Sequence, residues 1–313
     1  MLIPSVAPDT LDPSRQQVIL DRAIPPGIFE IRDRPTVSVE VLKPFLKWAG
    51  GKTRLLPQLL PYVPKAFRDY HEPFLGGGAV FFAARSRTTG RSFLADLNEE
   101  LVNTWIMVRD QPDQLVRALG AYVGKDSEDE YYAVRGATPL ETLERAARFI
   151  YLNQTAWNGL WRVNRWGAFN VPWGDRPFRG VDAGELQRVS VGVRAASIEV
   201  ADFRTSLERV HAGDFVYLDP PYLPVSDTSK FSGYTEKRFR LADLQELAEA
   251  CKSLTKRGAH WVLSNRDNRT IRELFADARV VSLTTRRAVA AQNRRDVQPA
   301  DSPEVIVVGG PTT

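Results

Sequence analysis

The chain of 313 residues has little of what disulfide, metal or membrane proteins depend on. Its one cysteine, Cys251, rules out an intrachain disulfide and a cysteine-rich metal site, and it fits a reducing compartment. The histidines His71, His211 and His260 lie far apart and lack the short spacings of metal ligands, so we expect no metal site. No apolar run is long enough to span a membrane and the N-terminus has no signal-peptide core, so we expect a cytoplasmic protein.

What is present is ordinary for a globular protein, with 43% hydrophobic and 26% charged residues. The length suggests about two domains, each able to bury a core. The net charge of +4 permits a polyanionic partner without requiring one. Residues 1–40 are rich in proline and contain only short apolar pieces, so we expect an N-terminal extension that is partly ordered at best.

The most informative stretch is Asp214-Phe-Val-Tyr-Leu-Asp-Pro-Pro-Tyr222. Its apolar part, Phe215–Leu218, predicts a short strand buried on both faces. Asp219 comes next, and the two prolines after it prevent both further strand pairing and a helix start. The pattern therefore predicts a carboxylate at the carboxyl end of a buried strand, where open α/β sheets bind their ligands.

This corner has the chemistry to bind an amino group. The carboxylate of Asp219 and the carbonyl of Pro220 are two acceptors in fixed geometry, which suits the exocyclic amine of a nucleobase. Tyr222 could stack on the base, an interaction worth ~1–3 kcal/mol. An ordinary strand-ending turn with a solvent-facing Asp would show the same four residues, so the rest of the chain must decide.

A glycine loop followed by an acid predicts an adenosine-containing cofactor. Tyr70–Phe82 has the pattern of a strand end, a loop with Gly76 and Gly78, and a helix. A second short strand ends in Asp96, twenty residues after Gly76, which is the spacing of an acid that binds ribose hydroxyls. The alternative role for Asp96 is the N-cap of the following helix.

A second glycine turn lies upstream, at Gly50-Gly51-Lys52-Thr53. It is not a nucleotide-triphosphate P-loop, because Leu46 stands where that motif needs glycine. We expect a turn at a helix N-terminus with Lys52 directed to an anionic group, a carboxylate or a phosphate.

The block 99–194 has no strong strand signal, and we expect helices over Leu115–Tyr122 and Leu140–Leu152. Within it, Asn153–Gly174 mixes tryptophan with arginine and asparagine, residues that contact phosphates, read base edges and wedge between bases. The alternative is a tryptophan-rich mini-core with a solvated rim. The tryptophans concerned are Trp157, Trp161, Trp166 and Trp173.

Strands and helices alternate before and after this block, which predicts one α/β sheet with a helical insertion. The elements expected after Tyr222 are a polar loop at 223–234 that closes over a ligand, a helix over Leu241–Leu254, a strand at Trp261–Asn265, a helix at Thr270–Phe275, and strands at Val280–Leu283 and Val305–Val308. The segment between the last two strands carries Arg286, Arg287, Arg294 and Arg295, which are candidate phosphate contacts or simply solvated.

Taken in order, these motifs resemble the Dam-type DNA adenine-N6 methyltransferases, the D12 class or alpha group. The motifs that carry the resemblance are Phe45–Lys52, Glu72–Gly78, Ala95-Asp96, the segment Leu152–Pro172, and Asp219–Tyr222, and the likeness covers about residues 44–308. It implies a Rossmann-like, S-adenosylmethionine-dependent methyltransferase domain formed by residues 41–98 and 195–313. Residues 99–194 would be an inserted, mainly helical DNA target-recognition domain, and residues 1–40 have no counterpart.

The resemblance also implies roles for individual residues. Those implied for catalysis are Asp219, Pro220, Pro221 and Tyr222, and those for the cofactor are Trp48, Lys52, Glu72, Phe74, Gly76, Gly78, Asp96 and again Asp219. Those implied for DNA binding are Lys47, Trp157, Asn158, Leu160, Arg162, Asn164 and Pro172. Arg162 matches an arginine that contacts a guanine, and Trp157 stands where the best-known members carry a tyrosine that intercalates beside the flipped adenine.

The activity implied is methyl transfer from S-adenosylmethionine to adenine N6 in double-stranded DNA, with GATC as the suggested target. A monomeric enzyme with a cognate restriction endonuclease as partner is compatible with this. Four alternatives remain open: a cytosine-N4 methyltransferase, an RNA or protein amide methyltransferase, a non-catalytic DNA-binding module, and a nicotinamide-dependent oxidoreductase. The last two leave either the cofactor loop or the Asp-Pro-Pro-Tyr motif unexplained.

Overall fold

The computed structural model describes residues 42–223, 239–286 and 301–311. The extension 1–40, most of the loop 223–234 and the basic segment 287–300 lie outside the described residues, so the expectations for them stay untested. The side chain of Arg286 also lies outside them.

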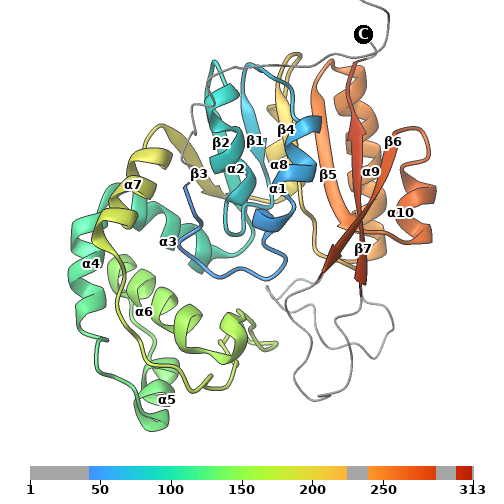
Figure 1. Cartoon of the computed structure of the whole chain (residues 1–313). Helices are drawn as coiled ribbons and strands as arrows, with labels where there is room; N and C mark the ends of the chain where they lie inside the picture. Colours follow the sequence, from blue (N-terminus) through green and yellow to red (C-terminus); the bar gives the residue numbers. More distant parts are fainter. Residues whose placement is uncertain (1–41, 224–238, 287–300, 312–313) are drawn as a thin grey trace, which may run out of the picture. The chain divides into compact units, whose positions relative to one another are not determined.

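The described part is built on one seven-stranded sheet in the order β3-β2-β1-β4-β5-β7-β6 (Figure 1). The strands are β1 (Tyr70–Glu72), β2 (Ser92–Asp96), β3 (Ala196–Val200), β4 (Phe215–Leu218), β5 (His260–Arg266), β6 (Arg279–Arg286) and β7 (Asp301–Gly309). The first five pair in parallel, whereas β7 is antiparallel to both of its neighbours. The strand order reverses between β1 and β4, and open α/β sheets bind ligands outside the carboxyl ends of the strands at such a point.

The two faces of the sheet pack against different helices. Side chains alternate along each strand, so Phe215 and Tyr217 point to one face and Val216 and Leu218 to the other. The first face packs against α1 (Leu56–Leu59), α2 (Ala79–Ala84) and the inserted helices. The second packs against α8 (Phe203–Glu208), α9 (Leu241–Lys256) and α10 (Arg269–Leu274). Burial on both sides explains why β4 is a continuous apolar run.

The insertion is helical, as predicted. Its helices are α3 (Glu99–Asp110), α4 (Pro112–Gly120), α5 (Glu128–Gly136), α6 (Thr142–Thr155) and α7 (Ala183–Val193), with a short 3-10 turn η5 (Trp157–Gly159). Its only strand-like pairings are the isolated bridges Ala156↔Trp173 and Val163↔Phe169. Trp105 and Phe149 of the insertion share one hydrophobic cluster with Phe215 of the sheet. The exact limits of a separate recognition domain therefore stay a prediction.

The predicted α/β class and the predicted strands and helices of the C-terminal half are confirmed. β3 was not predicted, and neither was α8. As an edge strand β3 buries only Ala196 and Ile198 and exposes Ser197 and Val200, which leaves little apolar signal in the sequence.

Asp214 fixes the amino end of β4. Its side chain is fully buried and accepts hydrogen bonds from Arg68 Nε (2.9 Å), from the backbone N–H groups of Asp69 (3.2 Å) and His211 (2.8 Å), and from His71 Nε2 (3.1 Å). Burial acts to raise the pKa of Asp214, but these donors outweigh it and hold that pKa below its usual value.

Candidate active site

Asp219 directly follows β4, at the point where the strand order reverses, and its side chain is 22% exposed. The ammonium Nζ of Lys52 lies 2.7 Å from Oδ2 and 2.7 Å from Oδ1, and Lys52 itself is buried. The same Nζ donates to the carbonyl of Gly50 at 2.8 Å. The anionic group expected opposite Lys52 is thus the Asp219 carboxylate, and the glycine turn at 50–51 brings the two together.

Ser264 of β5 is the second group that holds Asp219. Its Oγ donates to Asp219 Oδ1 at 3.0 Å, and Tyr217 OH lies 2.7 Å from the same Oγ. Because the Ser264 proton goes to Asp219, the Tyr217 hydroxyl donates to Ser264. Tyr217 pairs with Val262 in the β4–β5 ladder, so Ser264, two residues after Val262, lies beside Asp219, two residues after Tyr217. Burial raises the pKa of Tyr217 well above its usual value, and the charge of Asp219 adds to this.

The rest of the motif continues along the same edge. Pro220 is buried, while Pro221 and Tyr222 are partly exposed. The Tyr222 hydroxyl donates to both carboxylate oxygens of Glu304, at 2.9 and 2.8 Å. Lys52 Nζ lies 5.6 Å from the centre of the Tyr222 ring.

The glycine loop after β1 packs directly against two tryptophans. Gly76 has φ +49°, and a Cβ there would lie 2.6 Å from the Trp48 ring, so only glycine fits. Trp105 Nε1 donates to the Gly76 carbonyl at 3.1 Å. Gly78, at φ +68°, is the N-cap of α2. Phe74, in contrast, stacks on Phe203 of α8 at 5.7 Å and so packs against the other face of the sheet.

Two further carboxyl groups line this edge. Glu72, at the end of β1, is buried and accepts a hydrogen bond from Tyr70 OH at 2.8 Å. Burial raises the pKa of Glu72 well above its usual value, and Asp219 acts in the same direction. Asp96, at the end of β2, accepts from the backbone N–H groups of Gly76 (3.0 Å) and Asn98 (2.9 Å). Burial raises the pKa of Asp96, although these hydrogen bonds oppose the shift.

Asp96 is not the N-cap of α3. That role belongs to Asn98, whose side chain accepts from the Leu101 N–H at 3.1 Å. The Asp96 carboxylate instead ties the glycine loop after β1 to the end of β2.

The segment expected to contact DNA includes a buried cluster of aromatic rings. Trp161 is buried, with its ring centre 4.0 Å from that of Phe149 and 4.6 Å from that of Phe169. Trp157 and Trp166 are 45% and 71% exposed. Trp161 therefore fits the mini-core interpretation, and the DNA-contact interpretation stays a prediction for the exposed Trp157 and Trp166.

Of the other expected DNA contacts, Pro172 lies beside Trp157, whereas Arg162 and Asn164 lie in the hairpin formed by residues 162–170. Pro172 is exposed, and its carbonyl accepts from the Trp157 N–H at 2.9 Å. Arg162 Nε donates to Asn170 Oδ1 at 2.7 Å, which holds the guanidinium beside the hairpin. Asn164 Oδ1 accepts from the N–H groups of Trp166 and Ala168, so that oxygen forms the hairpin turn.

Asn158 and Leu160 flank a left-handed turn. Asn158 (φ 55°) and Gly159 (φ 64°) both have left-handed backbones, and Leu160 is partly buried. Asn153 is fully buried and links this turn to Lys47, which is exposed. Its Oδ1 accepts from the Lys47 N–H at 2.9 Å, and its Nδ2 donates to the carbonyls of Lys47 (2.7 Å) and Gly159 (3.4 Å). Lys47 and Trp157 are thereby held in one surface region.

Sequence reasoning missed Ser264, Tyr217 and Glu304. Polar or acidic residues within otherwise apolar strands were the available signal, since Ser264 follows Trp261-Val-Leu and Glu304 precedes Val305-Ile-Val-Val.

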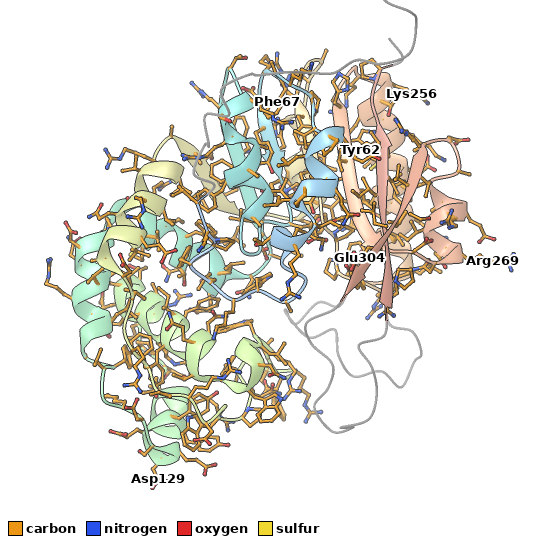
Figure 2. All side chains as sticks on the ribbon, viewed as in Figure 1. Tyr62, Phe67, Asp129, Lys256, Arg269 and Glu304 are labelled. Carbon is orange, nitrogen blue, oxygen red and sulfur yellow. The ribbon has the colours of Figure 1, made fainter. Side chains whose placement is uncertain are left out.

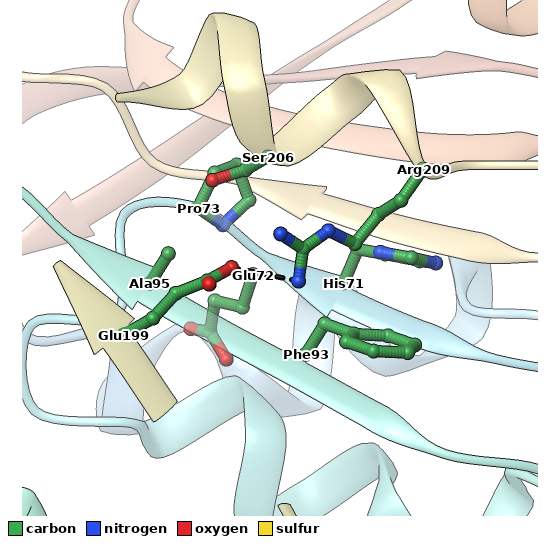
Figure 3. A pocket seen from close by; sticks show the side chains of 8 residues that line it. All are labelled: His71, Glu72, Pro73, Phe93, Ala95, Glu199, Ser206 and Arg209. Carbon is green, nitrogen blue, oxygen red and sulfur yellow. Dashed lines mark ion pairs between the residues drawn. The ribbon is translucent and has the colours of Figure 1, made fainter. Parts of the chain in front are cut away.

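A small crevice lies where β1, β2 and β3 meet α8, and Glu72 and Pro73 are among the residues that line it (Figure 3). It is lined by His71, Phe93 and Ser206 among others, and an ion pair between Arg209 and Glu199 (2.7 Å) spans it. Among the described residues, no group of His, Cys, Asp and Glu is arranged to hold a metal. None of the helices described has the length and apolar character needed to cross a membrane.

Comparison with known proteins decides the family. The model of the D12 class N6 adenine-specific DNA methyltransferases matches residues 48–289, which is most of the chain. The chain belongs to this family. A type II methyltransferase M1.LlaDCHI of Lactococcus lactis is 34% identical over 80% of this chain and 91% of its own length.

Two other relatives agree. The type II methyltransferase M.MjaIII of Methanocaldococcus jannaschii is 38% identical over 72% of this chain and 85% of its own, and the DNA adenine methylase of Escherichia coli K12 is 32% identical over 79% and 89%. Among solved structures, a precorrin-8W decarboxylase of Methanobacterium thermoautotrophicum aligns at 10% identity over 82% of this chain and 89% of that one, with a TM-score of 0.37.

Family membership settles the class of reaction. The protein is an adenine-N6 DNA methyltransferase, and DNA is its substrate. The alternatives of a non-catalytic DNA-binding module, an oxidoreductase and a cytosine-specific enzyme are set aside.

Proposed function

We propose that the enzyme transfers the methyl group of S-adenosylmethionine to N6 of an adenine flipped out of double-stranded DNA, with Asp219 and the Pro220 carbonyl as acceptors for the amine. The observation that carries this is the place of Asp219. It lies at the reversal of the strand order, its carboxylate is oriented from two sides, and it remains partly exposed.

The chemistry follows from the adenine amine. Its nitrogen lone pair is delocalised into the ring, which makes N6 a poor nucleophile. Two acceptors that take both N–H bonds favour a more pyramidal nitrogen with its lone pair directed at the methyl group. The same acceptor dipoles stabilise positive charge that develops on N6, the preorganised electrostatic effect common in enzymes. The adenine must first leave the helix, which costs a few kcal/mol of unstacking.

The ion pair with Lys52 leaves Asp219 able to accept hydrogen bonds from the adenine amine. A carboxylate has about four lone-pair positions. Lys52 and Ser264 occupy some of them in the structure, and the partial exposure of Asp219 leaves an approach for an amine. The ammonium also offsets the repulsion between Asp219 and nearby Glu72, whose pKa is raised in part by that charge.

The residues proposed for S-adenosylmethionine fit an adenosine with a charged tail. Asp96 is partly exposed and spends one hydrogen bond on each oxygen, so lone pairs remain for ribose hydroxyls. In the glycine loop, Gly76 lies against Trp48 with no room for a side chain. Glu72 and Phe74 flank the same loop, Phe74 from the opposite face of the sheet.

The DNA is proposed to meet the surface that holds Lys47, Trp157, Asn158, Leu160 and Arg162, with Asn164 and Pro172 at its margin. Trp157 is 45% exposed, as a side chain that wedges between bases would need to be. GATC is the proposed target. We further propose a cytoplasmic monomer, with a cognate restriction endonuclease as candidate partner, because two relatives are named type II methyltransferases.

Replacement of Asp219 by Ala tests the catalytic assignment. Incorporation of labelled methyl groups into DNA should be abolished, while binding of S-adenosylmethionine and of DNA is partly kept. Asp113→Ala changes an exposed aspartate of α4 and is the matched control. Normal turnover by Asp219→Ala would refute the role.

Two other measurements test the cofactor and the target. Isothermal titration should show binding of S-adenosylmethionine and none of NAD, and Asp96→Ala should weaken the former. Incubation with mixed-sequence DNA, followed by base-resolution mapping, should place N6-methyladenine within GATC. Methylation at another sequence would leave the chemistry intact and replace the target.

A further inference from the structure

Glu304 is a charged residue in an apolar strand, and neither the motifs nor the proposed function uses it. It lies near the start of β7, where Figure 2 labels it, and is 8% exposed. In the ladders it pairs with Arg266, the last residue of β5, and with Leu283 of β6. Because β7 runs antiparallel to β5, its start lies at the edge of the sheet where β5 and β4 end.

Strand alternation directs Glu304 to the active-site face. Ile306, two residues further along β7, belongs to the same hydrophobic cluster as Tyr217. Glu304 has the same parity as Ile306, so it points to the face that also carries Ser264. Its carboxylate reaches the Tyr222 hydroxyl, which donates to Oε1 at 2.9 Å and to Oε2 at 2.8 Å.

We propose that Glu304 is a positioning residue for methyl transfer, which acts by fixing and polarising the ring of Tyr222. This inference rests on the proposed role of Tyr222 as the surface on which the flipped adenine stacks. Pro220 and Pro221 restrict the backbone before Tyr222, and Glu304 holds the far end of its ring. Together they leave the ring little freedom to rotate away from the base.

The charge of Glu304 has a second effect. A phenol that donates to a carboxylate gains electron density in its ring, and hydrogen bonds to ionised acceptors are the stronger ones. An electron-rich aromatic face attracts cations. As the N6–methyl bond forms and the sulfur–methyl bond breaks, the positive charge passes from the sulfonium, which leaves as a neutral thioether, to the adenine, which afterwards loses an N6 proton to solvent. This attraction therefore grows towards the transition state. Only interactions that strengthen in this way accelerate the chemical step.

The test is a double-mutant cycle of Tyr222→Phe, Glu304→Ala and the combined variant. Each single variant should lower kcat about tenfold, with KM for DNA changed less than about twofold. Both variants remove the same hydrogen bond, between Tyr222 and Glu304, and this bond matters mainly in the transition state. The combined variant should be no slower than either single variant. Glu304→Gln, which keeps an acceptor oxygen but no charge, should lie between Glu304→Ala and the wild type.

A spectroscopic readout separates positioning from folding. With 2-aminopurine in place of the target adenine, stacking on Tyr222 quenches the flipped base, so Glu304→Ala and Tyr222→Phe should show brighter emission than the wild type. A loss of stability alone would not produce this. Glu199→Gln, a glutamate on β3 that pairs with Arg209, is the control for charge removal elsewhere on the sheet.

The outcomes also separate this inference from the proposed function. Full kcat in Glu304→Ala with an inactive Tyr222→Ala would overturn the inference and keep the stacking role of Tyr222. An active Tyr222→Ala would overturn the stacking role itself. Multiplying effects in the combined variant would show that Glu304 acts elsewhere. If Glu304→Ala fails to fold, the cycle of Glu304→Gln with Tyr222→Phe gives the same decision.

Discussion

Two aspartates stand five residues apart at opposite ends of β4, and the structure gives them different surroundings. Asp214 at the amino end is fully buried and receives donors from Arg68, His71 and two backbone N–H groups. Asp219 at the carboxyl end is 22% exposed and receives donors from Lys52 and Ser264. The first has its acceptor capacity filled, whereas the second keeps capacity that faces solvent.

The comparison teaches that residue type does not separate a structural carboxylate from a functional one. What separates them is whether the protein itself occupies every acceptor position. The same contrast recurs for tryptophan, serine and histidine in this chain, so each pair can be used to test it.

The aspartate pair should show the largest effect. Asp219→Asn should lower kcat at least about a hundredfold, because one acceptor oxygen becomes a donor facing the amine. It also removes the charged partner of Lys52, whose side chain is 7% exposed, so its unfolding free energy should fall as well, and the loss of kcat is the effect that sets it apart. Asp214→Asn should mainly lower the unfolding free energy, by ~1–3 kcal/mol, because its amide places a donor in a fully buried position on which four donors already converge. Urea unfolding and steady-state methylation on both variants measure this; the contrast breaks down if Asp214→Asn folds as well as the wild type.

The tryptophan pair comes next. Trp161→Ala removes a buried ring between Phe149 and Phe169 and should lower stability by ~3–5 kcal/mol. Trp157→Ala, at a 45% exposed position, should change stability by less than ~1 kcal/mol. It should instead reduce methylation and the fluorescence rise of a flipped 2-aminopurine. Equal thermal shifts for the two variants would show that exposure does not divide their roles.

The serine pair tests the support of Asp219. Ser264→Ala removes a donor to Asp219 and a partner of Tyr217, and kcat should fall about tenfold, with KM for DNA nearly unchanged. Ser190→Ala is the matched control, because Ser190 is equally buried and its hydroxyl donates to the carbonyl of Arg109, on α3. It should affect stability alone. If Ser264→Ala had the same kcat as the wild type, Lys52 alone would be sufficient to orient Asp219.

The sequence predicted Asp219 because its signals are local: an apolar run, then an acid, then two prolines. Asp214 carried no such signal, since its partners Arg68 and His71 lie more than a hundred residues away in the chain. Ser264 lay in a predicted strand and Glu304 directly before one, yet their direction depends on the registers of β4 with β5 and of β5 with β7. Register comes from tertiary pairing, which a single sequence does not display.

The smallest effect concerns His71, the buried partner of Asp214. Burial lowers the pKa of His71, although the charge of Asp214 opposes the shift, and its Nδ1 has no hydrogen-bond partner among the described residues. Below about pH 6.5 the unfolded chain binds a proton at His71 that the folded chain refuses, so stability should fall as the pH drops from that value towards the lowered pKa. Above about pH 6.5 this contribution is constant. The loss is bounded by ~1.4 kcal/mol per pH unit.

Urea unfolding between pH 7.5 and pH 5.5 measures this loss, and the whole range lies above the usual pKa of an aspartate, so Asp214 stays ionised. His71→Phe keeps a ring against Phe93, 5.0 Å away in the wild type, and should remove the pH dependence that His71 causes. His211→Asn changes an exposed histidine and should leave that dependence in place. If the unfolding free energy of His71→Phe fell with decreasing pH as steeply as that of the wild type, groups other than His71 would cause the acid sensitivity. The two histidines would then not differ in this respect.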